Sequence, residues 1–411
     1  MRSVWGWLAA LALAACTGPT PGAGKPPALG LTPVAFSVVP GWQQDHLSDA
    51  MTALRRECTV LATLPADTAL GGESPATHPG GRAGDWRPLC TAIATVAPGD
   101  NVGARATLER ALQPYAISDN GQAEGLFTGY YEPEVAGALH RGGRYQTPLL
   151  RRPGDLVQAD LGQFATDLKG HTIEGRVSGA HLVPYYDRAD IESGTLDRQK
   201  LALMYLADPI DAFFLQIQGS GIVKLNDGKT LRLAYAAKNG RPYTPIGRVL
   251  IANGALDRKN VSLQTIRAWL NAHPSAAKGV MEADESFVFF ELAPLGDPAL
   301  GSPGTEGVPL TPMASLAIDE RFHPFGAPIY IATMIPDPDA AKPDQNFQRL
   351  LIAQDTGGAI KGAARGDIFF GPGAKAEAIA GRLNAHGQFF VLIPKAAATA
   401  LGSGKDFPDA P

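Results

Sequence analysis

The spacing of hydrophobic and polar residues changes along the chain, and the first part has the spacing of helices. In the stretch HLSDAMTALRRECTVLA, one apolar face is formed by Leu47, Met51, Leu54, Cys58 and Leu61. Ser48 is predicted to cap this helix, and Asp100 is predicted to cap a second helix in NVGARATLERALQPY. Helices are therefore expected from about residue 36 to about residue 115.

Short strands and turns replace this pattern from GLFTGYYEPEV onward. The Asn239-Gly240 pair in LRLAYAAKNGRPYTPIG predicts a β-hairpin, because both residues tolerate the positive φ of a tight turn. We interpret DPIDAFFLQIQGSGIVKL as a strand with a break at Gly219 and Gly221. VSLQTIRAWLNAH predicts an amphipathic helix that begins near Ser262.

A third region follows SFVFFEL and contains four or more predicted strands, in MASLAIDERFHPFGAPIYIAT, LLIAQDTGGAIKG, GDIFFG and GQFFVLIP. One helix is predicted here, in KAEAIAGRLNAH. The chain has 47 glycines and 34 prolines and few long apolar periodic runs, so the fold class is expected to be mainly β.

Composition limits the possible functions. A chain of 411 residues with 45% hydrophobic and 18% charged residues can form one large domain or two. The formal net charge of −4, without a basic run among aromatic residues, argues against nucleic-acid binding. The histidines are scattered and no GxSxG or phosphate-binding motif occurs, so no metal or cofactor is expected. Carboxylates remain the best candidates for chemistry.

The N-terminus predicts export and lipidation. Arg2 precedes an apolar run over residues 4–15, which has the length of a signal-peptide core and is too short to span a bilayer. The run ends in LAAC, which resembles the lipobox of bacterial lipoproteins. Residues 1–16 are therefore interpreted as a lipoprotein signal, with Cys16 as the lipidated residue. An ordinary signal peptide with a chance cysteine is the alternative.

The segment after Cys16 predicts a surface-anchored protein. Residues 17–35 are rich in proline and glycine and are expected to form a flexible tether. Thr17, which is not an aspartate, indicates the periplasmic face of the outer membrane of a Gram-negative cell. In that compartment disulfides persist, so Cys58 and Cys90 are predicted to form a bridge between two N-terminal helices. Two unpaired core cysteines are the alternative.

Three aspartates stand at the ends of predicted C-terminal strands. Asp319 and Asp355 each end an apolar strand, and Asp367 opens one. Three such carboxylates could share one end of a barrel. Asp367 precedes Ile-Phe-Phe, and an apolar wall raises a carboxyl pKa, which suits a general acid. Asp355 lies beside a threonine and two glycines and is expected to accept backbone N–H bonds. Turn-capping aspartates are the alternative for all three.

Several motifs occur together in an order that resembles one family. DTGGAIKG and GDIFFGPG, with LAID and PFGAPIYI upstream, resemble the 3D domain, which is named for three aspartates. GLFTGYYEPEV, FFLQIQGSG, YAAKNGRPYTPIG and SFVFFEL extend the similarity, so the chain is similar to the membrane-bound lytic murein transglycosylase A family over roughly residues 120 to 395.

The resemblance implies a domain organisation. Residues 36–132 and 286–400 would form a six-stranded double-psi β-barrel domain with N-terminal helices, and the 3D region would cover about 307–395. Residues 133–285 would form a smaller β-rich inserted domain, with the glycan in a groove between the two.

The resemblance also implies an activity. The family cleaves the β-1,4 bond between N-acetylmuramic acid and N-acetylglucosamine in peptidoglycan without water, as a carbon–oxygen lyase and exotransglycosylase. Asp367 would act first as acid and then as base, with Asp355 and Asp319 as supporting carboxylates. Thr128 in FTGYYEP would contribute to the site.

Further substrate contacts are expected in the same motifs: Tyr130, Tyr131, Gln216, Gln218, Ser220, Asn239, Gly357 and Gly358. The tyrosines offer aromatic faces to sugars or pack in the core. The two glutamines would share one strand face, where they bind the substrate or face solvent. Ser220 and Asn239 are alternatively turn residues. The glycines would allow a close approach of sugar to backbone.

Three other functions are weighed against this one. DTGG also occurs in aspartic proteases, but the chain has a single triplet of this kind and would have to dimerise, whereas a monomer is expected. A non-catalytic lipoprotein that binds peptidoglycan would need the groove and not the carboxyl. A muramidase would use Glu132 or Asp355 as a second carboxylate. The expected partners are glycan strands, the outer membrane and proteins of cell-wall synthesis or hydrolysis.

Overall fold

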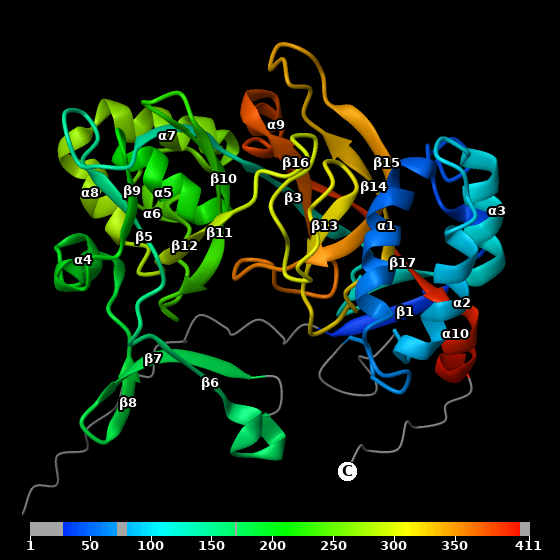
Figure 1. Ribbon diagram of the computed structural model, residues 1–411. Helices are drawn as coiled ribbons and strands as arrows, with labels where there is room; N and C mark the ends of the chain where they lie inside the picture. The colour runs from blue at the N-terminus through cyan, green and yellow to red at the C-terminus, as the bar shows by residue number, and fades with distance from the viewer. Residues whose placement is uncertain (1–27, 72–79, 169–170, 403–411) are drawn as a thin grey trace, which may run out of the picture.

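A closed six-stranded β-barrel forms the centre of the first domain in the computed structural model, which describes residues 28–71, 80–168 and 171–402 (Figure 1). The strands follow one another around the barrel as β17-β14-β15-β13-β16-β3, and β3 pairs with β17 to close it. Their bounds are β3 (Gly125–Glu132), β13 (Ser315–Ile318), β14 (Pro328–Ile335), β15 (Gln345–Asp355), β16 (Arg365–Pro372) and β17 (Asn384–Pro394). The expected mainly β fold with a six-stranded barrel is confirmed.

Two more strands extend the barrel sheet beyond β17. β2 (Leu112–Asp119) pairs with β17, and β1 (Leu29–Pro33) pairs with β2 in antiparallel register. Leu29 and Leu31 pack against the barrel core. The prediction of a flexible tether over 17–35 is therefore wrong for residues 29–33, because alternating leucines give that segment an apolar face to bury.

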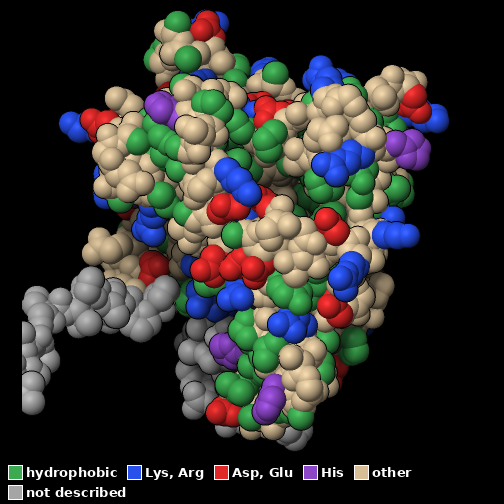
Figure 2. All heavy atoms as spheres, turned by 90° about the vertical axis from the view of Figure 1, so that its left-hand side faces the viewer, with side chains coloured by type: hydrophobic (Ala, Val, Ile, Leu, Met, Phe, Trp, Pro, Cys, Tyr) green, Lys and Arg blue, Asp and Glu red, His purple; other side chains and the backbone are tan. Residues whose placement is uncertain are grey.

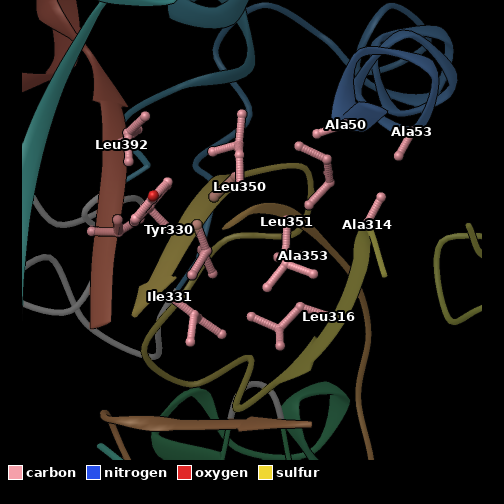
Figure 3. Packing of buried hydrophobic residues seen from close by; sticks show 14 of the residues in the cluster. Ala50, Ala53, Ala314, Leu316, Tyr330, Ile331, Leu350, Leu351, Ala353 and Leu392 are labelled. Atoms are coloured by element: carbon pink, nitrogen blue, oxygen red, sulfur yellow. The ribbon is translucent and has the colours of Figure 1, made fainter. Parts of the chain in front are cut away.

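Three helices cover one side of the barrel: α1 (Ser48–Leu61), α2 (Ala83–Ile93) and α3 (Asn101–Ala111). Ala50 and Ala53 on α1 belong to the same buried cluster as the β15 residues Leu350, Leu351 and Ala353 (Figure 3). The small alanine side chains let the helix lie close to the sheet. One hydrophobic core therefore runs from the barrel into the helices.

The predicted disulfide is confirmed, and one helix cap differs from its prediction. Cys58 on α1 and Cys90 on α2 are joined with an S–S distance of 1.99 Å and a Cα–Cα distance of 5.5 Å. Asp100 caps α3 as predicted, since its carboxylate accepts the Gly103 N–H at 2.8 Å. Ser48 does not cap α1 but begins it, and its N–H donates to the Asn101 side chain at 2.9 Å.

The inserted domain is built on a six-stranded sheet of order β12-β11-β10-β4-β9-β5. Its strands are β4 (Glu134–Ala138), β5 (Thr147–Leu150), β9 (Ala202–Leu206), β10 (Gly221–Leu225), β11 (Thr230–Lys238) and β12 (Val288–Ala293). The helices around it are α4 (Arg188–Glu192), α5 (Pro209–Gln218), α6 (Ile246–Ala252), α7 (Leu263–Ala272) and α8 (Pro274–Glu282). Figure 1 shows this domain beside the barrel domain.

A three-stranded sheet projects from the inserted domain. It consists of β6 (Val157–Asp160), β7 (Thr172–Ser178) and β8 (His181–Pro184), with short 3-10 turns at Leu161–Gln163 and Thr166–Leu168. Figure 1 shows it hanging below the rest of the insert. We call residues 157–168 and 171–184 the arm.

Three predicted elements differ in the structure. Residues 209–218 form helix α5 and not a strand, because the Asp208 side chain caps it, Pro209 occupies its first turn and Gly219 ends it at φ 78°. Asn239-Gly240 does not close a hairpin, since β11 ends before it and pairs with β10 and β12. The helix predicted at 375–386 is α9 (Gly373–Ala380), and β17 begins at Asn384. The Ser262 cap of α7 is confirmed.

A last helix, α10 (Lys395–Gly402), follows β17. Across the described ranges, no helix has both the length and the apolar character needed to cross a bilayer. Cys16 and the predicted signal lie outside those ranges.

Candidate active site

The candidate site lies in one row across neighbouring barrel strands. Ala317 on β13 pairs with Asp355 on β15 at one side and with Asp367 on β16 at the other. Asp367 in turn pairs with Thr128 on β3. Because neighbouring strands are spaced by about 4.8 Å, the backbones of the two aspartates are roughly 10 Å apart. The fold thus brings together residues that the sequence separates widely.

A chain of two hydrogen bonds ends on the Asp367 carboxyl. The Thr128 hydroxyl donates to Asp367 Oδ1 at 2.6 Å, and Arg365 Nη2 donates to Thr128 Oγ1 at 2.6 Å. Arg365 also donates to the carbonyl oxygens of Leu126 and Gly366, which fixes the guanidinium against the barrel wall. Arg365 was not identified from the sequence, although it lies two positions before Asp367 on the same strand face.

The surroundings of Asp367 favour its protonated form. Ile368, Phe369 and Phe370, which follow it, are buried, while the aspartate itself is partly exposed. Burial raises the pKa of Asp367 above its ordinary value, and Arg365 and the Thr128 hydroxyl counteract part of this rise. The carboxyl therefore keeps its proton to a higher pH than an ordinary aspartate does, as the sequence predicted.

Asp355 is held by four donors. Its carboxylate accepts hydrogen bonds from the Tyr130 hydroxyl at 3.0 Å, the Thr305 hydroxyl at 2.9 Å, the Thr305 N–H at 3.2 Å and the Thr356 N–H at 3.0 Å. Burial raises the pKa of Asp355 in spite of these bonds. The Tyr130 ring packs on Phe369 at 5.1 Å between centroids. Asp355 thus fixes Tyr130 and the loop that carries Thr305.

Asp319 belongs to a different set of contacts. Its buried carboxylate accepts two bonds from the Arg321 guanidinium, at 2.9 and 2.6 Å, and one from the Gly362 N–H at 2.8 Å. Burial acts to raise the pKa of Asp319, but the bonds from Arg321 and Gly362 outweigh it and lower the pKa. This carboxylate stabilises the turn between β15 and β16, and its contacts do not include Thr128 or Tyr130.

Tyr243 of the inserted domain is close enough to Asp367 to be influenced by its charge. Its side chain is 36% exposed. Burial raises the pKa of Tyr243 to about 12, and the negative charges of Asp284 and Asp367 add to the rise. The charge of Asp367 is therefore felt across the boundary between the two domains. Tyr243 was missed as a site residue, although it lies in the quoted motif YAAKNGRPYTPIG.

Family profiles match most of the region that contains this site. The profile described as "MltA specific insert domain" matches residues 126–291, and the "3D domain" profile matches residues 314–393. The membrane-bound lytic murein transglycosylase A of Escherichia coli K12 is 34% identical over 286 residues, which are 68% of this chain and 67% of the relative. This chain belongs to the membrane-bound lytic murein transglycosylase A family.

Other members of the family agree with this assignment. The protein of the same name from Vibrio cholerae is 39% identical over 209 residues, and the match spans about half of each protein, 50% of this chain and 55% of the relative. A crystal structure of a membrane-bound lytic murein transglycosylase from Agrobacterium tumefaciens superposes with a TM-score of 0.78 at 31% identity, over 90% of this chain and 99% of that one. Escherichia coli MltA with bound chitohexaose gives a TM-score of 0.62 at 25% identity, over 90% and 95%.

Three residues expected to bind substrate are buried instead. Tyr131 lies in the barrel core, where it belongs to the main hydrophobic cluster. Gln216 lies on helix α5, where its Oε1 accepts from the buried Arg188 at 2.7 Å. Asn239 donates to the carbonyl oxygens of Tyr186 and Glu285 and so joins two loops. These side chains serve the internal structure of the transglycosylase fold and are not on its surface.

The remaining expected contacts are accessible. Gln218 and Ser220 are partly exposed at the end of α5, where Gln218 accepts the Tyr131 N–H at 2.9 Å. Gly357 and Gly358 lie beside Asp355, and neither has a positive φ. A Cβ added at Gly358 would meet nothing within 4 Å. The backbone there does not require glycine, which fits a surface left bare for a ligand.

Glu132 is fully buried at the junction of the two domains. Its carboxylate accepts the Ser302 N–H at 3.0 Å and lies 3.4 Å from Arg232 Nη2. Such a carboxylate is not available to a substrate. Across residues 28–71, 80–168 and 171–402, no three His, Cys, Asp or Glu side chains converge as metal ligands would.

Proposed function

We propose that this chain is a lytic transglycosylase that cleaves the β-1,4 bond between N-acetylmuramic acid and N-acetylglucosamine in peptidoglycan without consuming water. The observation that carries the proposal is the Asp367 carboxyl, which is partly exposed, accepts a hydrogen bond from Thr128 and has a pKa raised by burial. A carboxyl of this kind is suited to give a proton to a leaving group near neutral pH.

The neighbouring carboxyls support a reaction with a single acid–base group. Asp355 already accepts four hydrogen bonds, and Glu132 is enclosed with Arg232 and Ser302. A glycoside hydrolase of the usual type needs a second carboxylate that attacks the sugar or activates water. Neither of these two is arranged for that task, which makes the muramidase alternative less favoured.

In the proposed first step, protonated Asp367 donates its proton to the departing glycosidic oxygen while positive charge develops at C1 of the muramic acid. The bond from C1 to that oxygen breaks, and Asp367 is left as a carboxylate. The hydrogen bond from Thr128, with Arg365 behind it, stabilises this carboxylate.

In the second step, the Asp367 carboxylate accepts the proton of the C6 hydroxyl on the same muramic acid. The C6 oxygen bonds to C1 and closes a 1,6-anhydro ring, and Asp367 is protonated again. Since the nucleophile is tethered to the reacting sugar, no second group has to position water.

The glycan strand would lie between barrel and insert. Partly exposed residues on its path are Tyr130, Gln218 and Ser220, and the backbone at 357–358 is bare. Tyr243 would meet the sugar from the insert side. The structure of the Escherichia coli relative with bound chitohexaose supports oligosaccharide binding in this family.

We further propose that the chain is anchored at the periplasmic face of the outer membrane through a lipid on Cys16. The LAAC motif and the relatives named membrane-bound support this location. We also propose the domain division expected from the sequence: barrel 36–132 and 286–400, insert 133–285.

Digestion of purified murein sacculi tests the reaction. A soluble form that lacks residues 1–16 is incubated with sacculi, and the released muropeptides are analysed by mass spectrometry. Products lighter by one water than hydrolysed muropeptides are expected. Hydrated reducing ends would contradict the lytic reaction and indicate a muramidase. Binding without any release would favour a non-catalytic tether.

A further inference from the structure

The arm has its apolar side turned outward. Strand register places on one face the side chains of Val157, Ala159, Ile173, Gly175, Val177, Leu182 and Pro184. The opposite face carries Gln158, Asp160, Thr172, Glu174, Arg176, Ser178, His181 and Val183. Every position on the first face is thus uncharged and without a hydrogen-bonding side chain, whereas the second face is almost entirely polar.

The polar face is the one directed at the body of the insert. The Arg176 guanidinium lies 4.6 Å above the ring of Tyr186, and Glu174 is so close to Gly240 that an added Cβ there would be 2.8 Å from its Cβ. Gln158 and Glu174 also line a cavity of about 80 Å³ against β11. The apolar face therefore points away from the protein, which reverses the usual arrangement of a one-sided sheet.

The outward residues are strongly exposed. Val157, Ile173, Val177 and Leu182 are 36%, 44%, 64% and 42% exposed. At the tip of the arm, Phe164 is 80% exposed and Leu168 is 36% exposed. Figure 2 shows hydrophobic side chains together with charged and histidine side chains over the lower, projecting part of the molecule. A contiguous exposed surface of this kind normally has a partner, which is a protein or a membrane.

We propose that this face of the arm lies on the surface of the lipid bilayer that carries the lipid anchor. A protein partner would normally find polar groups around an apolar centre, and the outward face of the three strands offers none. A bilayer interface requires apolar side chains and no matched hydrogen bonds, which is what the sheet face offers, and the exposed Phe164 and Leu168 add apolar surface to the arm.

The anchor and the arm are compatible in position. Cys16 precedes the first described residue, Ala28, by twelve positions, so a lipid on Cys16 lies at most about 40 Å from Ala28. Both β1 and the arm lie on the lower side of the molecule in Figure 1. The anchor would hold a weak apolar contact at high local concentration, which makes it effective. This inference rests on the proposed lipidation of Cys16.

Vesicle binding by protein without the anchor tests the proposal. The soluble form that lacks residues 1–16 is mixed with phosphatidylcholine–phosphatidylethanolamine vesicles and sedimented. Measurable binding that changes little between 50 and 500 mM salt is expected, because the face carries no charge. Phe164→Ser with Val177→Ser should reduce the partition coefficient at least about tenfold, since each buried methylene contributes about 0.8 kcal/mol. Val102→Ser, at an equally exposed valine on α3, should not change it.

A single label separates membrane contact from other causes. In the form that lacks residues 1–16, the remaining cysteines Cys58 and Cys90 are bridged, so Val177→Cys supplies one free thiol for an environment-sensitive fluorophore. A blue shift upon addition of vesicles is expected, with no shift for the same label at Val102→Cys.

Equal binding by the arm variant and its parent, or no shift at 177, would overturn the proposal. A dimer in vesicle-free solution that dissociates in the arm variant would overturn it too and assign the face to a second copy. Both readouts are independent of murein cleavage, so their failure is distinct from failure of the proposed reaction.

Discussion

The Asp367 carboxyl combines an apolar environment with one strong hydrogen bond. The buried side chains after it favour the neutral acid, while Thr128 and Arg365 favour the carboxylate. These opposing influences suit a group that must give up a proton and then take one back. Two substitutions test the roles of the Asp367 proton and of the Arg365 charge.

Asp367→Asn removes the proton that the proposed reaction needs and leaves the side-chain volume almost unchanged. Murein cleavage should fall by about 100- to 10,000-fold, the usual range for loss of a general acid–base. Binding to sacculi and thermal stability should persist. Asp344→Asn, an exposed change in the same domain, is the matched control and should keep full activity. Near-normal turnover in Asp367→Asn would reject the assigned role.

Arg365→Gln removes a positive charge and the bond to Thr128. A nearby cation stabilises the carboxylate, so its loss should raise the pKa of Asp367 further. Because the protonated form starts the reaction, activity that declines as the pH rises should decline at a higher pH in the variant. The pH profile of kcat/KM checks this, with Arg365→Lys retaining the charge as control. A profile that is unchanged or shifted to lower pH would contradict the link through Thr128.

The environment of a residue could be predicted from the sequence where it depends on neighbouring positions in the chain. The apolar residues after Asp367 and the donors beside Asp355 follow directly in sequence, and both expectations agree with the structure. Gln216 and Asn239 were misjudged, because their burial depends on Arg188 and on loops far away in the chain. A polar residue near a motif does not reveal whether it faces a ligand or an internal partner.

At the scale of elements, the wrong prediction gave more weight to an apolar run than to the residues that begin and end a helix. The run in 209–218 was interpreted as a strand, although Asp208, Pro209 and Gly219 are the residues that begin and end a helix. The disulfide was predicted correctly, because Cys58 and Cys90 lie in consecutive helices that must pack. Helix α1 also contains a buried carboxyl whose burial no local pattern indicates.

Helix α1 places a carboxyl, Glu57, in the core beside the site loop. Gln354 Nε2 donates to it at 3.1 Å, and Glu306 lies next to it in the loop that follows Thr305. Burial raises the pKa of Glu57 to about 8, and Glu306 adds to the rise, while Glu320 acts similarly on Glu306. The folded state thus binds a proton that the unfolded chain releases near pH 4.5.

This difference makes stability depend on pH. The stability that Glu57 contributes is fully present below about pH 4.5 and is lost as the pH rises toward about 8. In this range the folded state must either keep the proton or bury a charged carboxylate, whereas the unfolded chain releases the proton into water. Glu57→Gln imitates the protonated carboxyl. In denaturant unfolding at pH 8.5 it should be more stable than the parent by about 1–3 kcal/mol, with little difference at pH 4. Exposed Glu291→Gln serves as control. If the free energy of unfolding changed equally with pH in parent and variant, the proton bound at Glu57 in the folded state would be contradicted.

At the scale of the whole molecule, the motifs led to the correct family and barrel. Closure of the barrel, however, depends on pairings such as β3 with β17 that join residues more than 250 positions apart, which periodicity does not encode. The outward apolar face of the arm likewise becomes visible only when register and neighbours are known.

The proposed anchoring concerns the intact protein and is tested in cells. Cys16→Ser removes the thiol that would carry the lipid and should move most of the protein from the membrane fraction to the periplasmic fraction. Fractionation followed by immunoblotting measures the distribution, and treatment at high salt removes ionic association. Full membrane retention of Cys16→Ser would count against lipidation.

The last strand of the barrel has a consequence for biogenesis. β17 pairs with β14, β3 and β2, so it joins the C-terminal strands to the earliest part of the domain. Until residues 384–394 have been synthesised, β2 and β3 lack their partner and the sheet cannot close. The barrel therefore stays open until the end of synthesis, whereas the six-stranded sheet of the insert does not include β17. In a chain exported as proposed, the barrel that carries Asp367 is thus completed only after β17 has been synthesised.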